Sequence, residues 1–353
     1  MSFINEAAVP VVQHRNWNWK LGQASSAPAA VAFVVVPGFE VGSKYSNGGT
    51  AFTANTFNPD DGSGAAGWTG GAYGAAGFVV VGSGASSAIS ANGISGWIIG
   101  TLAAFPPPLT FVGSSQIMAY LRGVARWSLG NQWSSDGINW NLSAGSGTGG
   151  ICASQTFNRF YQANGSSGAL YSANGDGGTW VSVPAVQFSS SFGLPINVKS
   201  MAAGATQNSV WACGEQDINL GIGTLSRVCI WRSNDGAIFS SVYVDPTPYD
   251  ADFQGCMEIA VSDDGTALVA LYNKLGSAYL LYSNDSGIFW NSILLGAANL
   301  ATKWNGLQWC AGNFYATRTN GQVLRGATGD TMAVVQTSIP AFATGTGCPV
   351  CNF

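Results

Sequence analysis

The stretch SSDGINW at residues 134–140 recurs along the chain as SNDGAIF at 233–239 and SNDSGIFW at 283–290. Each copy opens with Ser, has Asp two residues later, and continues through Gly to an aromatic residue. Ser hydroxyls and Asp carboxylates hydrogen-bond to backbone N–H groups of tight turns, and Gly adopts the positive φ that these turns need. The pattern therefore predicts a repeated hairpin turn whose role is structural. We expect its trailing aromatic residue to pack over the turn of its own unit.

Weaker copies of the turn extend the pattern to seven units, which open at Ser46, Ser90, Ser134, Ser172, Ser233, Ser283 and Ala327. Successive spacings are 44, 44, 38, 61, 50 and 44 residues. Four short apolar stretches, separated by Gly, Asn and Asp turns, fill a unit, and a period near 40 residues with four strands is typical of a propeller blade. We predict an all-β, seven-bladed β-propeller with four antiparallel strands per blade and the repeated turns between strands 3 and 4.

The composition supports one all-β domain over residues 1–353. Hydrophobic residues make up 46 % of the chain, aromatic residues 12 % and charged residues only 8 %, with 48 glycines. Abundant aromatic residues and few charges argue against disorder, and abundant glycine argues for many turns. We expect residues 1–24 to complete a blade and residues 340–353 to form a C-terminal tail.

Charge and cysteine content restrict the partners. The net charge of −4 offers no basic surface for nucleic acid, and no apolar run is long enough for membrane insertion. No signal peptide is evident at the N-terminus. Five of the seven cysteines lie in strand-like stretches and are expected to be free, buried hydrophobic residues, as suits a reducing compartment: Cys152, Cys213, Cys229, Cys256 and Cys310. The terminal CPVC (Cys348, Cys351) can hold a disulfide or a metal, but zinc needs two further ligands, so no metal site and no cofactor is predicted.

The turn resembles the Asp-box repeat, S-x-D-x-G-x-x-W, of sialidase-like propellers and related lectins, a repeat that is also found in bacteriophage virion proteins. The resemblance covers most of the chain as a periodicity and is clearest in three units. Its structural turn residues are Ser134, Asp136, Gly137, Trp140, Ser233, Asp235, Gly236, Ser283, Asp285, Gly287 and Trp290. In that family the Asp box marks the fold and occurs with many functions, so the resemblance implies architecture rather than activity.

An enzymatic role is not expected. The sialidases of the family use three arginines, a Tyr–Glu nucleophile pair and an Asp, together with an early Phe/Tyr-Arg-Ile-Pro motif that this chain lacks. Glu258, in a predicted inner strand, can face the central channel, but no other residue in the sequence points to chemistry there. A single histidine, His14, makes hydrolase and metalloenzyme readings weak.

Binding is expected on the face opposite the repeated turns, where the long loops between strands 2 and 3 and between blades gather. Variable loops on a rigid scaffold are where recognition usually occurs. These loops are acidic and carry aromatic residues, which suits neutral sugars, a cation or a protein partner. The candidate binding residues are Trp68, Asp60, Asp61, Glu215, Asp217, Tyr249, Asp250 and Asp252.

Three functions remain open at this point. The first is a non-enzymatic structural or attachment protein of a virus particle (a bacteriophage tail, spike or capsid-decorating protein), made in the host cytoplasm. Its partners would be other virion proteins or further copies of itself, with a host-surface glycan as a further partner. The second is a free carbohydrate-binding propeller lectin, and the third is a diverged sialidase-like glycosidase.

Overall fold

The computed structural model describes residues 33–35, 44–46, 53–54, 68–82, 86–103, 117–143, 147–189, 196–219, 224–247, 249–250, 256–274, 276–297, 304–310, 312–318, 322–336 and 349–350. Within these ranges the regular secondary structure is almost entirely β-strand, as the composition predicts. Three short 3-10 turns interrupt the strands: Arg122–Val124, Ala185–Gln187 and Gly329–Thr331. No helix in the described part is long and apolar enough to cross a membrane.

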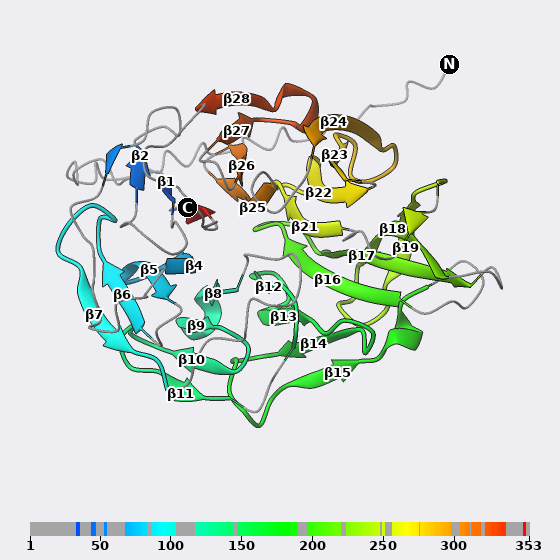
Figure 1. The fold of residues 1–353 in the computed structure, drawn as a ribbon. Helices are drawn as coiled ribbons and strands as arrows, with labels where there is room; N and C mark the ends of the chain where they lie inside the picture. The colour runs from blue at the N-terminus through cyan, green and yellow to red at the C-terminus, as the bar shows by residue number, and fades with distance from the viewer. Residues whose placement is uncertain are drawn as a thin grey trace, which may run out of the picture.

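Six blades stand around a common centre, each made of four consecutive antiparallel strands (Figure 1). The first three blades contain β4 (Trp68–Gly74), β5 (Gly77–Gly82), β6 (Ser86–Ser90), β7 (Ile98–Thr101); β8 (Ala119–Leu121), β9 (Arg126–Ser128), β10 (Gln132–Ser134), β11 (Asn141–Leu142); and β12 (Ile151–Ser154), β13 (Arg159–Ala163), β14 (Ala169–Ser172), β15 (Val181–Val183).

The next three blades contain β16 (Ile196–Ala203), β17 (Val210–Asn219), β18 (Thr224–Ser233), β19 (Ser240–Val244); β21 (Cys256–Val261), β22 (Leu268–Lys274), β23 (Ser277–Ser283), β24 (Asn291–Ala297); and β25 (Trp304–Cys310), β26 (Asn313–Arg318), β27 (Val323–Gly326), β28 (Ala333–Gln336). A short strand, β20 (Tyr249–Asp250), also pairs with β18 and lengthens that blade. The architecture is therefore a β-propeller with four antiparallel strands per blade.

The structure corrects the predicted number of equivalent units, since six blades rather than seven are built from four consecutive strands. Around the turn at Ser46 there are only three short strands, β1 (Phe33–Val35), β2 (Lys44–Ser46) and β3 (Thr53–Ala54). Their sheet takes its fourth strand, β29 (Pro349–Val350), from the other end of the chain. The repeat count missed this because the composite sheet draws on two distant segments.

The first strand of each blade lies nearest the centre (Figure 1). These inner strands contact one another in sequence, from β4 through β8, β12, β16 and β21 to β25, and β29 contacts both β25 and β4. Apolar side chains fill the spaces between blades. Between the blades that begin with β12 and β16, for example, Tyr161, Met201 and Trp231 are fully buried. Because one ring of strands holds the blades, the ends of the inner strands define the centre of each face.

The turns near residues 90, 134, 172, 233, 283 and 327 connect the third and fourth strands of the six blades. Strand direction alternates within a meander, so these turns share a face with the turns that join strands 1 and 2. We call this the turn face. The opposite face carries the strand 2–3 loops and the connections between blades, and we call it the loop face.

Candidate functional site

The repeated turn is closed by its own side chains. The Ser134 hydroxyl donates to Asp136 Oδ1 at 3.0 Å and accepts the Gly137 N–H at 2.8 Å. Asp136 Oδ1 also accepts the backbone N–H groups of Ile138, at 2.9 Å, and Asn139, at 2.8 Å. Gly137 has a φ of 77°, in the left-handed region that favours glycine. The Ser and Asp are thus occupied in holding the backbone, as the sequence predicts for a structural turn.

The other copies repeat this geometry. Ser233 and Asp235, like Ser283 and Asp285, form the same Ser-to-Asp hydrogen bond, at 2.8 Å and 2.7 Å. Partial burial acts to raise the pKa of Asp136, but the hydrogen bonds from Asn139, Ile138 and Ser134 outweigh it and lower that pKa to about 2. Backbone N–H groups likewise lower the pKa of Asp235 and Asp285. These carboxylates are therefore fixed as acceptors, since each lowered pKa reflects hydrogen bonds to the ionised form.

Several turns also pack against the preceding blade, although some trailing aromatic residues cover their own unit as expected. The Trp290 indole N–H, for example, donates to the Gly287 carbonyl of its own turn at 3.0 Å. The Trp140 indole N–H donates to Ser87 Oγ on β6 of the preceding blade at 3.0 Å. A Cβ added at Gly236 would lie 2.0 Å from the Tyr161 hydroxyl on β13. Glycine is needed at such positions because no side chain fits between the two blades. The turns therefore fasten one blade to the next.

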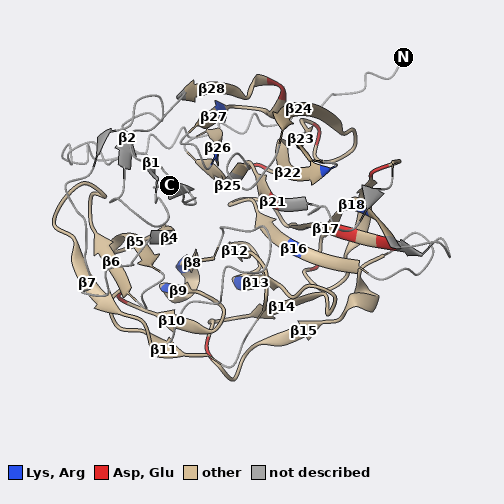
Figure 2. Ribbon diagram, in the orientation of Figure 1, with Lys and Arg blue, Asp and Glu red and all other residues tan. Residues whose placement is uncertain are grey.

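The acidic candidates on the loop face are largely paired within the protein. Glu215 is 6 % exposed, and its carboxylate forms an ion pair with Lys199 Nζ at 3.3 Å. Asp217 accepts a hydrogen bond from the Ser226 hydroxyl at 2.9 Å. Both acids lie on β17, whose far end extends to one side of the ring and is marked red in Figure 2.

Of the remaining candidate binding residues, the structure describes the backbone of some and leaves others outside the described part. Tyr249 and Asp250 form β20, which pairs with β18 at Ser226, so β18 lies between them and Asp217 on β17. Trp68 is the first residue of β4, and its side chain lies outside the described part. The same holds for all of Asp60, Asp61 and Asp252. Thus four of the eight candidates lie on the β17–β18 hairpin or on β20, which pairs with it, and binding at the loop face remains a prediction.

The Glu258 carboxylate is not exposed in the central channel. Its side chain is fully buried on β21, and its carboxylate accepts the backbone N–H of Leu307 on β25, the inner strand of the next blade. β-bulges occur at the same level of both strands, between Cys256 and Glu258 and between Asn305 and Leu307. The carboxylate therefore links two blades where their inner strands are irregular.

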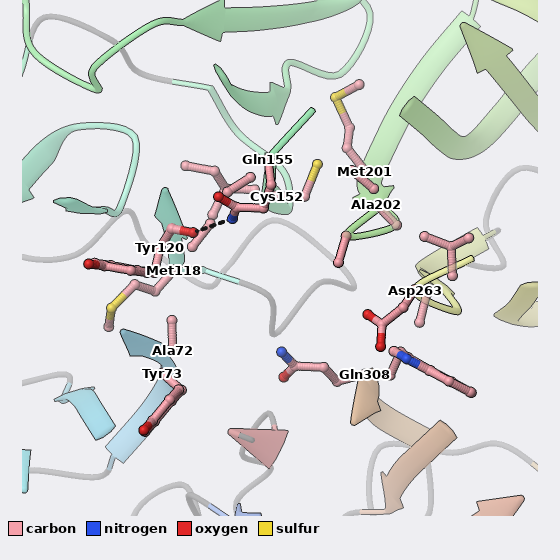
Figure 3. Close-up of a pocket in the computed structure, with 18 of the residues that line it drawn as sticks. Ala72, Tyr73, Met118, Tyr120, Cys152, Gln155, Met201, Ala202, Asp263 and Gln308 are labelled. Atoms are coloured by element: carbon pink, nitrogen blue, oxygen red, sulfur yellow. Dashed lines mark hydrogen bonds between the residues drawn. The ribbon is translucent and has the colours of Figure 1, made fainter. Parts of the chain in front are cut away.

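A cavity of about 140 Å³ lies at the centre of the turn face (Figure 3). It is formed where the inner strands end, so every one of the six blades contributes to it. Its walls are rich in small side chains, which leave the centre open. The lining residues are Gly71, Ala72, Tyr73, Met118, Ala119, Tyr120, Arg122, Ile151, Cys152, Ala153, Gln155, Met201, Ala202, Ala203, Ala205, Ala260, Val261, Asp263, Gln308 and Trp309.

Polar groups cluster on one side of this cavity. The Gln308 amide and the Asp263 carboxylate point into the space between the inner strands (Figure 3). The indole nitrogen of neighbouring Trp309 is buried and has no hydrogen-bond partner among the described residues. The cavity therefore offers an acceptor at Asp263 and an amide at Gln308 within one wall, beside the buried indole nitrogen of Trp309.

The opposite side of the cavity is fixed by Gln155. Its Nε2 donates to the Tyr120 carbonyl at 3.0 Å, and its Oε1 accepts the Arg122 N–H at 3.0 Å (Figure 3). This amide is occupied in joining two blades. Burial raises the pKa of the Cys152 thiol, which therefore remains protonated and is a poor nucleophile. The groups best placed to meet a ligand are thus those on the Asp263 side.

Sequence reasoning missed this cavity because it searched the loops of the opposite face. The available signal was a small residue near the end of several first strands, such as Ala153 in ICAS and Ala202 in SMAA. Among the described residues, no group of three or more side chains is arranged to hold a metal ion.

One cysteine prediction is wrong. Cys152, Cys213 and Cys229 are free, as predicted, but Cys310 is disulfide-bonded. A buried thiol in an apolar strand and a buried half-cystine give the same sequence pattern, so the pattern could not separate them. The side chains of Cys256, Cys348 and Cys351 lie outside the described residues.

No protein-family model matches the chain, and no curated protein matches its sequence. Solved structures similar to it include one from a nidogen/laminin complex, with 12 % identity, a TM-score of 0.47, and 90 % of this chain and 97 % of that chain covered. YCF48 bound to D1 peptide is 12 % identical with a TM-score of 0.48, covering 82 % and 90 %. A GH74 enzyme from Niastella koreensis is 15 % identical with a TM-score of 0.39, covering 90 % and 40 %. The fold assignment rests on the sheet topology of this chain.

Proposed function

We propose that this protein is a non-enzymatic attachment propeller of a virus particle and that it binds a neutral glycan in the cavity of the turn face. The observation that carries the binding proposal is that Asp263 and Gln308 point into a cavity that is rich in small residues. The repeated turns, which we assign to the Asp-box type, serve the scaffold in this proposal.

The polar wall matches the chemistry of a sugar. A sugar hydroxyl can donate to the Asp263 carboxylate while it accepts a hydrogen bond from the Gln308 amide. The half-buried rings of Tyr73 and Tyr120 provide apolar surface for the C–H face of a pyranose. At about 140 Å³ the cavity is smaller than the roughly 300–1,000 Å³ typical of drug-sized ligands, so it suits a single sugar ring.

Binding rather than hydrolysis is proposed because the carboxylates are few. Glycoside hydrolases mostly use two acids about 5–9.5 Å apart across the scissile bond. The described lining contains one acid, Asp263, and Glu258 is occupied by the neighbouring blade. The sialidase-like alternative would require a second acid from outside the described residues.

A glycan array tests the binding proposal. We expect wild-type protein to bind one class of neutral glycans, and Gln308→Leu to lose that signal because it removes the amide at nearly constant volume. Gln187→Leu makes the same change at an exposed position away from the cavity and should leave the signal intact. An equal loss in both variants, or no signal on any neutral glycan, would refute the site.

The virion assignment rests on composition: few charges and many Gly and aromatic residues. Mass spectrometry of purified virus particles tests it. Finding the protein at a stoichiometric level in particles supports an attachment role, whereas glycan binding by a protein that is absent from particles would favour the free lectin.

A further inference from the structure

We propose that the cavity of the turn face recognises the acetamido group of an N-acetylated amino sugar, with Asp263 accepting its N–H and Gln308 donating to its carbonyl. This inference rests on the proposed function and names the class of neutral glycan that the cavity binds. It is carried by the turn that holds Asp263, by the open carboxylate of that residue, and by the small apolar side chains beside it.

The turn that carries Asp263 has the chemistry of the repeated turns but joins strands 1 and 2 of its blade. Residues 262–265, between β21 and β22, read SDDG. The Ser262 hydroxyl donates to Asp264 Oδ1 at 2.6 Å, and Asp264 Oδ1 accepts the Thr266 N–H at 3.0 Å. Because this copy of the turn follows an inner strand, it holds Asp263 at the central cavity instead of at the rim of the ring.

The two adjacent carboxylates of this turn have different roles. Asp264 is occupied in closing the turn, whereas the half-buried Asp263 carboxylate has no hydrogen bond or ion pair with any described residue. The backbone of Asp263 is fixed, since its carbonyl accepts the Thr206 N–H at 3.0 Å and the Thr206 hydroxyl at 2.7 Å, from the preceding blade. The turn therefore presents an open acceptor from a rigid support.

Gln308 supplies the complementary group. It lies on β25 of the next blade, and its side-chain amide points into the same space as the Asp263 carboxylate (Figure 3). A carboxylate only accepts hydrogen bonds, whereas a primary amide also donates. An acetamido group carries one N–H donor and one carbonyl acceptor on separate atoms, so each of these two side chains can bind its own atom of the group.

Small apolar side chains adjoin this pair. Ala202, Ala203 and Ala205 come from the end of β16 and the turn after it, and Ala260 from β21. β16 and β21 are inner strands in contact with each other, so these alanines lie on the Asp263 side of the cavity. The methyl of an acetamido group can be buried against them, which is favourable for apolar surface. A hydroxyl at the same carbon leaves this wall uncovered.

Ligand-observed NMR titrations with two matched pairs of sugars test the inference. N-acetylglucosamine differs from glucose, and N-acetylgalactosamine from galactose, only in the group at C2. We expect the acetamido member of at least one pair to bind about tenfold more tightly or better, since one additional apolar carbon in a pocket typically contributes about that factor. Asp263→Ala should weaken its binding about tenfold, because the acetamido N–H loses its acceptor.

Asp330→Ala is the control, since it makes the same change at an exposed turn outside the cavity and should keep the wild-type affinities. Urea denaturation checks that Asp263→Ala is folded. Equal binding of both members of each pair, tighter binding of the ammonium sugar glucosamine, or unchanged binding by Asp263→Ala would each overturn the inference while leaving the glycan site. Absence of binding to every sugar would overturn the proposed function as well.

Discussion

Replacing Gly287 with Ala tests whether the repeated turns fasten neighbouring blades. Gly287 has a φ of 83°, and an added Cβ would lie 2.7 Å from Cη2 of Trp211, on β17 of the preceding blade. Trp211 is fully buried, so its ring cannot move aside without disturbing the core. Left-handed backbone costs a non-glycine residue about 1–2 kcal/mol and overpacking about 1–3 kcal/mol. We expect the free energy of unfolding to fall by about 2–5 kcal/mol, the sum of the two terms.

Gly276→Ala separates the two causes. Gly276 has a φ of 73°, but an added Cβ there would meet nothing within 4 Å, so only the backbone cost of about 1–2 kcal/mol applies. Urea denaturation followed by tryptophan fluorescence measures both variants. In thermal melts, each kcal/mol lost from the free energy of unfolding should lower the Tm by about 1.3 °C for a chain of 353 residues. If both variants lose the same free energy of unfolding, the contact with Trp211 contributes nothing. That result would refute the idea that the turns fasten neighbouring blades.

Three further predictions concern the same framework. Ser134→Ala removes the acceptor of the buried Gly137 N–H and should cost about 1–3 kcal/mol in urea denaturation; no change would show that the hydroxyl is dispensable. Glu258→Gln keeps an acceptor for the Leu307 N–H, so Glu258→Ala should unfold at lower urea than Glu258→Gln, and the reverse order would contradict the blade link. Because the pKa of Asp136 is lowered to about 2, its contribution to stability is complete above about pH 4 and is lost as the pH falls towards 2. Asp136→Asn should flatten that part of the pH–stability curve, and an unchanged curve would refute the assignment.

The fold could be predicted from the sequence because its signal is local and repeated. The turns that open at Ser134 and Ser233 are held by hydrogen bonds between residues close in sequence. A short sequence pattern is therefore enough to predict them. The composite sheet could not be predicted in the same way. Val34 pairs with Val350, and no local pattern indicates a pairing between the two ends of the chain.

The candidate site was less predictable for a related reason. Asp263 and Gln308 are ordinary polar residues in sequence, and they meet only because two inner strands end at the same level of the ring. Acidic character drew attention to Glu215 instead, whose charge is balanced by Lys199. Sequence reveals which charges exist, whereas pairing within the fold decides which of them remain open to a ligand.

The direction in which the turns pack has a consequence for biosynthesis. Gly137, Gly236 and Gly287 each contact the blade that precedes their own, so the docking surface for a new turn has already left the ribosome when the turn emerges. At roughly 5–20 residues per second a unit of about 44 residues follows its predecessor within about 2–9 seconds. The blades can therefore fold in chain order, and each new blade can pack against the one before it. The composite sheet forms after the six blades, because β29 follows all of their strands in the chain.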